Sequence, residues 1–304
     1  MIISINKLQH WIQMHQQRIK QQIKQQQTKR IKQQRIKQQR IKIKQQRIKQ
    51  QQIKQPLKQP LNQPSKQQLL KHQLLKQPGI PLHIYQVWHS SELPNSVKEC
   101  IDNIKSTNPE FTHHLYNMDD CRQFIVDNFS TETVDAFDSL VPHAYKIDLF
   151  RYCMMYQCGG IYLDSKLYCV NDFKFIYLTD SEYFCEDIKG MNPPGIYNAI
   201  LVCKPYNNIM LKAINKILYN VKNKYYGDCG LEPTGPKMLG SFFSNNELQQ
   251  LILHNEYDAD IGGPSHIKFD ILPILRIHPK YREECKLLNH THWSDYWKNK
   301  TAYL

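Results

Sequence analysis

The stretch "AYKIDLFRYCMMYQCGGIYLDSKLYC" (residues 144–169) decides the fold of this 304-residue chain. Its apolar residues recur every three or four positions over 144–158, which is typical of a helix with one buried face. Gly159 and Gly160 predict the end of that helix, with Gly159 as the left-handed residue that follows it. The apolar residues "IYL" then form a short buried strand, and Asp164 lies at its carboxyl end.

The segments before this stretch alternate between strands and helices. Residues 82–88 ("LHIYQVW") and 111–117 ("FTHHLYN") are rich in β-branched and aromatic residues and predict strands. Residues 96–106 and the segment "MDDCRQFIVDNF" each follow a polar capping residue and predict helices. This order predicts an α/β domain with a parallel sheet. Open α/β sheets bind ligands at the carboxyl ends of their strands, so Asp164 is expected to contact a ligand rather than merely cap a loop.

Asp148 and Arg151 are three residues apart on the predicted helix, so their side chains are neighbours on one face. One interpretation is a local ion pair of small energetic value. The other is that both side chains approach a ligand held near Asp164. The spacing alone leaves both interpretations open.

The C-terminal half predicts a strand over 198–203, a helix over 207–221, a short helix after "TGP" (234–236) and β structure over 266–279 that is interrupted at Pro273. His290 and His292 lie two apart. On an extended segment their side chains point to the same side and are candidates for binding a metal or a phosphate, against the alternative of surface histidines.

The charge is divided unevenly between two parts of the chain. Residues 1–78 contain 19 of the 40 Lys and Arg and no Asp or Glu, whereas residues 79–304 contain 21 Lys and Arg against all 27 Asp and Glu. The first part repeats "RIKQQ", which gives neither a helix nor a strand an apolar face. We therefore predict a low-complexity, disordered basic tail over 1–78 and one folded domain over 79–304. A tail of this kind attracts polyanions without specificity.

Cysteine usage and hydropathy indicate in which cellular compartment the protein is expected. The nine cysteines form no CxxC pair, which favours free thiols in a reducing environment over a disulfide framework or a zinc site. No run reaches the roughly 18 apolar residues that a membrane span needs. The opening "MIISI" is too short for a signal peptide. We expect a cytoplasmic protein, and the abundance of Ile, Lys, Asn and Tyr fits an AT-rich genome such as that of a large DNA virus.

Several segments, taken in order, resemble glycosyltransferase family 32, the Och1-like enzymes with a DxD motif in their sugar-binding region. "IPLHIYQVW" resembles the opening strand of that family, and "AYKIDLFRYCMMYQCGGIYLD" resembles its central helix, Gly-Gly turn and metal strand. "NAILVCKPYNN", "TGP" and "HTHW" resemble later segments around the donor. The resemblance covers about residues 80–297 and implies a GT-A fold, a Rossmann-like domain that binds a nucleotide sugar.

The resemblance also implies roles for individual residues. It places Gln86 and Trp88 near the nucleotide base, with Tyr85 standing where the family often has His. Asp148 and Arg151 would contact the sugar or ribose and, with Asp164, would be the catalytic residues. Asp164 and His290 or His292 would hold a divalent metal, usually Mn²⁺. The nucleotide-sugar site implied in this way comprises Tyr85, Gln86, Trp88, Asp148, Arg151, Gly160, Asp164, Ser165 and Lys166.

Lys166 stands where the second carboxylate of the DxD motif is expected. Oxygen ligands hold Mg²⁺ or Mn²⁺, and an ammonium repels them. Three interpretations remain: Lys166 pairs with the diphosphate and partly replaces the metal, the metal persists on Asp164 and a histidine, or the site binds a sugar nucleotide without turnover. If the strand continued through it, Lys166 would point to the same side as Asp164.

Two classes of function therefore compete. The first is a glycosyltransferase that moves a sugar from a UDP- or GDP-sugar to a hydroxyl of a glycan or protein, with retention of the anomeric configuration. The second is a non-catalytic protein that binds a sugar nucleotide, or works through its basic tail on nucleic acid. The acidic domain and the absence of aromatic residues interleaved in the repeat favour the first class.

Overall fold

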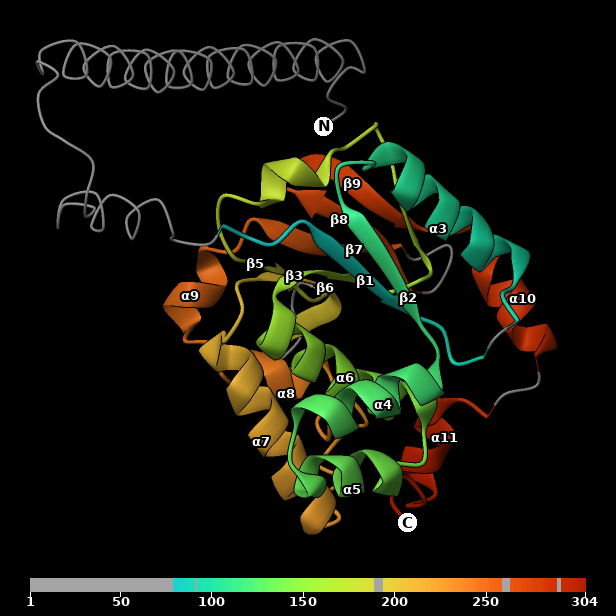
Figure 1. Ribbon diagram of the computed structural model, residues 1–304, viewed down its shortest axis with the longest axis vertical. Helices are drawn as coiled ribbons and strands as arrows, with labels where there is room; N and C mark the ends of the chain where they lie inside the picture. The colour runs from blue at the N-terminus through green and yellow to red at the C-terminus, as the bar shows by residue number, and fades with distance from the viewer. Residues whose placement is uncertain (1–78, 91, 189–193, 259–262, 289–290) are drawn as a thin grey trace, which may run out of the picture. The chain divides into compact units, whose positions relative to one another are not determined.

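The computed structural model describes residues 79–304 except 91, 189–193, 259–262 and 289–290 (Figure 1). They belong to a compact unit, Leu70–Leu304. The predicted tail over 1–78 lies outside the described residues.

The domain begins with a strand–helix–strand–helix unit, as predicted. Its elements are β1 (His83–Val87), α3 (Asn95–Thr107), β2 (Thr112–Tyr116) and α4 (Met118–Asn128). The Asn117 side chain accepts hydrogen bonds from the backbone N–H groups of Asp119 and Asp120, while Asp120 accepts one from the N–H of Asn117. This reciprocal capping fixes the start of α4. Strand β1 pairs in parallel with both β2 and β3 (Gly160–Leu163).

The stretch over 144–169 folds largely as its pattern predicts. Helix α6 (His143–Cys158) ends at Gly159, whose φ of 62° lies in the left-handed region. A Cβ atom on Gly159 would lie 2.5 Å from the backbone N of Pro205, so this turn requires glycine for space as well as for conformation. A further helix, α5 (Thr131–Ser139), precedes α6 and was not predicted from the sequence.

The remaining elements complete a mixed sheet. They are β4 (Leu167–Cys169), η1 (Phe175–Leu178), β5 (Tyr183–Glu186), β6 (Ile196–Cys203), α7 (Asn208–Lys222), α8 (Pro236–Gly240), α9 (Asn245–Gln249), β7 (Leu253–Asp258), β8 (Gly263–Phe269), β9 (Leu272–Ile277), α10 (Tyr281–Leu287) and α11 (Trp293–Lys298). Over the described residues the strand order is β2-β1-β3-β6-β5-β7-β8-β9-β4. Strands β2, β1 and β3 are parallel, and β6 is antiparallel to β3. The predicted α/β class is confirmed, but the sheet is mixed, whereas a parallel sheet was expected.

The prediction of a break at Pro273 was wrong. The chain turns instead at Asp270, which has a φ of 57°, and Pro273 lies inside β9. Proline lacks an N–H donor and is tolerated in a strand where the pairing is irregular. Pro273 lies opposite Lys268, next to a shift in the register between β8 and β9.

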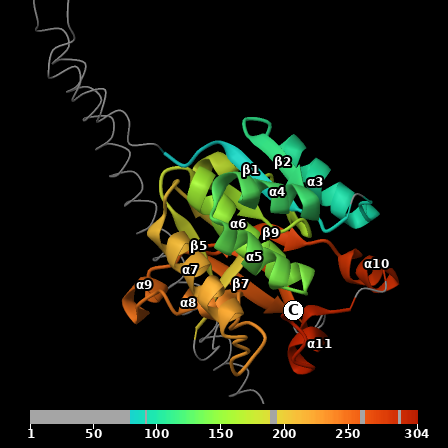
Figure 2. The ribbon, with the colours of Figure 1, turned by 60° about the horizontal axis from the view of Figure 1, so that its bottom comes forward.

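The sheet has a buried layer on each face. Helices α4, α5, α6 and α7 lie side by side on one face (Figures 1 and 2), where Tyr85 and Tyr162 pack against α6. On the other face, Ile84 and Ile161 belong to a second cluster with η1 and strands β8 and β9. Burial on both faces explains why "IYL" is an uninterrupted apolar run. All four residues of β3 are buried, and Asp164, directly after its carboxyl end, is partly exposed.

Two expectations on composition can be compared with the structure. All nine cysteines are free. Among the described residues, no helix has both the length and the apolar character that a membrane crossing would require.

Candidate functional site

Asp164 lies at the end of β3, in a tight turn. Its backbone carbonyl accepts a hydrogen bond from the N–H of Leu167 at 3.1 Å, so the chain reverses over Ser165 and Lys166. The strand therefore does not continue, contrary to the condition under which Lys166 was expected beside Asp164. The turn nevertheless brings the Lys166 Nζ to 2.8 Å from Asp164 Oδ2.

Arg151 connects the two carboxylates that the sequence placed on different elements. Its Nη1 lies 3.1 Å from Asp164 Oδ1, and its Nη2 lies 3.3 Å from Asp148 Oδ1. Nη1 also donates to the backbone carbonyl of Asn198 at 2.6 Å. The local ion pair is thus confirmed and extends to the end of β3, while the approach of both side chains to a ligand stays a prediction.

Asp148 is enclosed by donors from three segments. Besides Arg151, Asn198 Nδ2 donates to its Oδ1 at 2.9 Å and Thr234 Oγ1 donates to its Oδ2 at 2.7 Å. Only 10% of its side chain is exposed. Burial raises the pKa of Asp148 to about 6, although Arg151 and these hydrogen bonds act to lower it. Asp148 therefore holds Arg151 and Asn198 in place and offers little surface to a ligand.

Asp164 has the opposite electrostatic balance. Burial would raise its pKa, but the positive charges of Lys166 and Arg151 lower it to about 2. Tyr162 also donates to Asp164 Oδ1, at 3.2 Å. The side chain remains 19% exposed. Asp164 is therefore ionised at neutral pH and, unlike Asp148, accessible.

The surroundings of Lys166 are aromatic and acidic. Its ammonium lies 5.8 Å from the centre of the Tyr197 ring, and Tyr281 and Asp187 interact with it electrostatically. Burial lowers the pKa of Lys166, but the charge of Asp164 raises it above the usual value. Lys166 is thus a fixed cation, and 23% of its side chain is exposed.

Of the residues predicted near the nucleotide base, Gln86 lies in β1 and Trp88 follows it directly. Gln86 is fully buried, with its Nε2 3.5 Å from the backbone carbonyl of Asp164 and its Oε1 2.7 Å from His113 Nε2. Trp88 is 5% exposed and donates through Nε1 to the carbonyl of Glu92. Both support the end of the sheet from inside.

Tyr85, Gly160 and Ser165 offer no exposed surface at the cluster. Tyr85 is 4% exposed and packs on the α6 face of the sheet, where its ring stacks on that of His114. Gly160 has a φ of 109°, and a Cβ atom there would lie 2.8 Å from the carbonyl oxygen of His83. Ser165 is 6% exposed, inside the turn.

The structure describes one of the two histidines of the predicted metal site. His290 lies outside the described residues. His292 is the residue before α11, and its Nδ1 accepts from the backbone N–H of Ser294 and lies 2.7 Å from Ser294 Oγ. These contacts are those of a helix cap.

The donor set at Asp164 does not fit a divalent cation. Each carboxylate oxygen already faces a cation, Arg151 at Oδ1 and Lys166 at Oδ2. Mn²⁺ and Mg²⁺ need several oxygen or nitrogen ligands free of such partners. Within the part of the chain that the structure describes, His, Cys, Asp and Glu side chains nowhere gather in threes that could hold a metal.

Sequence reasoning missed four polar partners of the cluster: Asn198, Thr234, Asp187 and Tyr281. Asn198 and Thr234 carried a usable signal, because both lie in segments that resemble donor-side segments of family 32, "NAILVCKPYNN" and "TGP". Asp187 is buried, which raises its pKa, and accepts from Asn255 Nδ2 at 3.0 Å. Nothing in the local pattern distinguishes Tyr281, on α10, from a core tyrosine.

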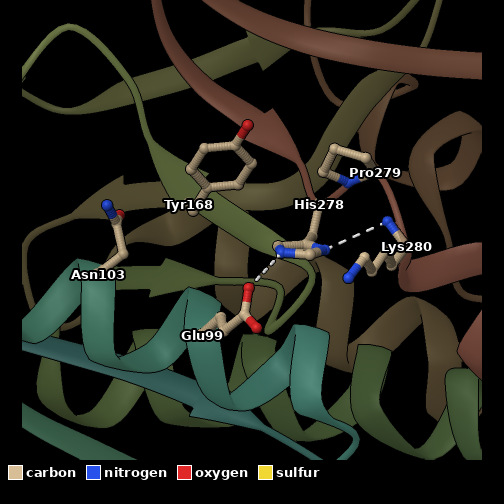
Figure 3. A pocket seen from close by; sticks show the side chains of 6 residues that line it. All are labelled: Glu99, Asn103, Tyr168, His278, Pro279 and Lys280. Carbon is tan, nitrogen blue, oxygen red and sulfur yellow. Dashed lines mark hydrogen bonds and ion pairs between the residues drawn. The ribbon is translucent and has the colours of Figure 1, made fainter.

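A surface hollow of about 430 Å³ lies along β4 and the end of β9 (Figure 3). It is lined by Glu99 and Asn103 of α3, by Tyr168, and by His278, Pro279 and Lys280. His278 Nε2 lies 2.9 Å from Glu99 Oε2. The backbone N–H of His278 donates to the carbonyl of Lys166 at 3.0 Å, so the wall of the hollow and the Asp164 turn share a hydrogen bond.

The family model described as "Capsular polysaccharide synthesis protein" matches residues 17–227, a range that contains Asp148, Arg151, Asp164 and Lys166. The chain belongs to this family. The match extends over more than half of the sequence and covers the sheet from β1 to β6.

Curated relatives match over shorter ranges than the family model does. An uncharacterized glycosyltransferase, L373, of Acanthamoeba polyphaga mimivirus is 30% identical over 92 residues, which are 30% of this chain and 37% of that protein. Inositol phosphoceramide mannosyltransferase 2 of Schizosaccharomyces pombe is 24% identical over 147 residues, 48% of this chain and 41% of the relative. The chain thus spans about two fifths of the length of these relatives.

Among solved structures, the PaToxG glycosyltransferase matches with a TM-score of 0.43 and 12% identity, over 54% of this chain and 68% of the other. The UDP-bound glycosyltransferase domain from the YGT toxin matches with a TM-score of 0.34 and 10% identity, over 56% of this chain and 66% of the other.

Proposed function

We propose that this protein is a glycosyltransferase that moves a sugar from a nucleotide sugar to an acceptor hydroxyl. The observation that carries the proposal is the linked cluster of Asp148, Arg151, Asp164 and Lys166 at the carboxyl end of β3. This is the edge at which open α/β sheets bind ligands. Two curated relatives are named as a glycosyltransferase and a mannosyltransferase, which supports the same activity.

The finer assignment rests on the resemblance to family 32. It comprises a UDP- or GDP-sugar as donor, a glycan or protein as acceptor and retention of configuration. The amino-acid composition fits an AT-rich genome, and the similarity to a mimivirus protein also supports a viral source. A cytoplasmic location and a working basic tail over 1–78 remain predictions.

In the proposed reaction the bond between the anomeric carbon and the diphosphate oxygen breaks, and its electron pair leaves with the diphosphate. The acceptor oxygen forms the new bond to the anomeric carbon, and its proton passes to the departing diphosphate. Asp164 is ionised and partly exposed, so it accepts hydrogen bonds from sugar or ribose hydroxyl groups. Arg151 and Asp148 hold the Asp164 carboxylate in one orientation and act as positioning residues.

Calorimetry of the full chain with UDP, GDP, UDP-glucose and GDP-mannose tests the proposal. We expect binding of one nucleoside diphosphate and its sugar, and a loss of at least about 10-fold in affinity for Asp164→Ala. Asp138→Ala is the matched control, because Asp138 is an exposed carboxylate paired with Arg122. Unchanged affinity in Asp164→Ala, or no binding of any of the four compounds, would refute the proposal.

A further inference from the structure

The net charge of the Asp164 turn determines whether a diphosphate would be attracted to it. A DxD motif with a bound dication has two negative and two positive charges and is neutral overall. Here Asp164 and Lys166 contribute one negative and one positive charge, so the turn is already neutral without a metal. A dication added to it would leave two uncompensated positive charges beside the buried guanidinium of Arg151.

The Asp164 oxygens are also committed to protein cations. A metal ion on Asp164 would have to displace Lys166 from Oδ2, or Arg151 from Oδ1. Arg151 is 7% exposed and is held by Asp148 and by the Asn198 carbonyl. Removing either cation from its carboxylate leaves a buried charge without its partner, which is costly.

Lys166 retains the capacity to bind an anion. An ammonium has three N–H donors, and among the described residues Lys166 bonds through its ammonium to Asp164. Its side chain is 23% exposed, so solvent or a ligand can approach the remaining donors. The backbone of Lys166 is fixed by the turn from Asp164 and by the bond from His278, while the Tyr197 ring confines its side chain.

We propose that Lys166, rather than a bound divalent cation, supplies the positive charge that faces the donor diphosphate in this protein. The ammonium keeps its bond to Asp164 and donates its free N–H groups to phosphate oxygens. In the transfer step it offsets the negative charge that develops on the departing diphosphate when the anomeric C–O bond breaks. This inference rests on the proposed function and implies that donor binding does not depend on metal.

The test is calorimetry of the full chain with UDP and GDP, once in EDTA and once with excess Mn²⁺. We expect equal affinity, within about threefold, in the two conditions for the wild type. In EDTA, Lys166→Met is expected to lose about 10- to 100-fold in affinity, whereas Lys166→Arg retains most of it. Lys212→Met, which alters an exposed lysine of α7, is the control and should match the wild type.

Lys166→Asp sharpens the test because it recreates a DxD motif. This variant is expected to bind the diphosphate weakly in EDTA and to regain affinity with Mn²⁺. Wild-type binding that disappears in EDTA and returns with Mn²⁺ would overturn the inference and leave the proposed function intact. Wild-type affinity in Lys166→Met in EDTA would overturn it as well. Absence of nucleotide binding in both conditions would instead refute the proposed function itself.

Discussion

Two pairs of side chains lie next to each other in this protein, have similar lengths, and differ in burial and in the partners that they share. Asp164–Lys166 and Glu99–His278 are 2.8 and 2.9 Å long, and the backbone of His278 is bonded to that of Lys166. Glu99 is 65% exposed, and its carboxylate is paired with His278 at the rim of the hollow (Figure 3). Asp164 is 19% exposed and shares Arg151 with a second carboxylate. The distance between two paired groups therefore says little about the importance of the pair, whereas burial and shared partners say much.

The largest effect that would sharpen this contrast is expected from Arg151→Met. It removes the cation that Asp148 and Asp164 share and leaves two buried carboxylates near each other. We expect a loss of about 3–5 kcal/mol in the free energy of unfolding. Urea unfolding followed by circular dichroism measures it.

Arg122→Met provides the control for that measurement. Arg122 makes a closer pair with Asp138, at 2.7 Å, but its side chain is 47% exposed. The expected change in the free energy of unfolding is much smaller than that of Arg151→Met, because solvent screens an exposed pair. Similar losses for the two arginine variants would contradict the argument from burial.

Thr234→Val is expected to have the next largest effect. It preserves the shape of a fully buried side chain and removes the hydrogen bond to Asp148 Oδ2. The expected loss in the free energy of unfolding is about 1–3 kcal/mol. Thr301→Val, at an exposed threonine, should change it by less than about 0.5 kcal/mol. Equal effects of the two valine substitutions would remove Thr234 from the network.

The pH dependence of stability tests the environment of Asp148. Its pKa of about 6 in the folded protein lies above the value of about 4 expected for an unfolded chain, so the folded state takes up a proton between these values. The free energy of unfolding of the wild type, minus that of Asp148→Asn, should therefore fall as the pH rises from about 4 to about 6. A difference that stays constant or rises over this window would show that Asp148 is not held in a protonation-favouring environment.

Glu99→Gln is expected to have the smallest effect. The exposed pair with His278 should contribute no more than about 1 kcal/mol to stability, and UDP or GDP affinity should remain that of the wild type. A loss of nucleotide affinity in this variant would show that the hollow is part of the nucleotide site. It would contradict the contrast drawn between the two pairs.

The sequence predicted those features that depend on local pattern. The αβ order, the glycine turn after α6 and the position of Asp164 at a strand end all follow from apolar spacing and from Gly159. The pattern could not predict how Asp148 is satisfied, because Asn198 and Thr234 are 50 and 86 residues away along the chain. It also left open whether the strand continues through Lys166, and so did not predict the turn from Asp164 to Leu167.

The most direct test of the account is a crystal structure of the full chain with bound UDP or GDP, grown in Mn²⁺ and measured at an energy where manganese scatters anomalously. The account predicts phosphate oxygens within hydrogen-bond distance of Lys166 Nζ, and no manganese peak between Asp164 and the diphosphate. A manganese ion coordinated by Asp164 and the diphosphate, with Lys166 displaced from the carboxylate, would contradict it.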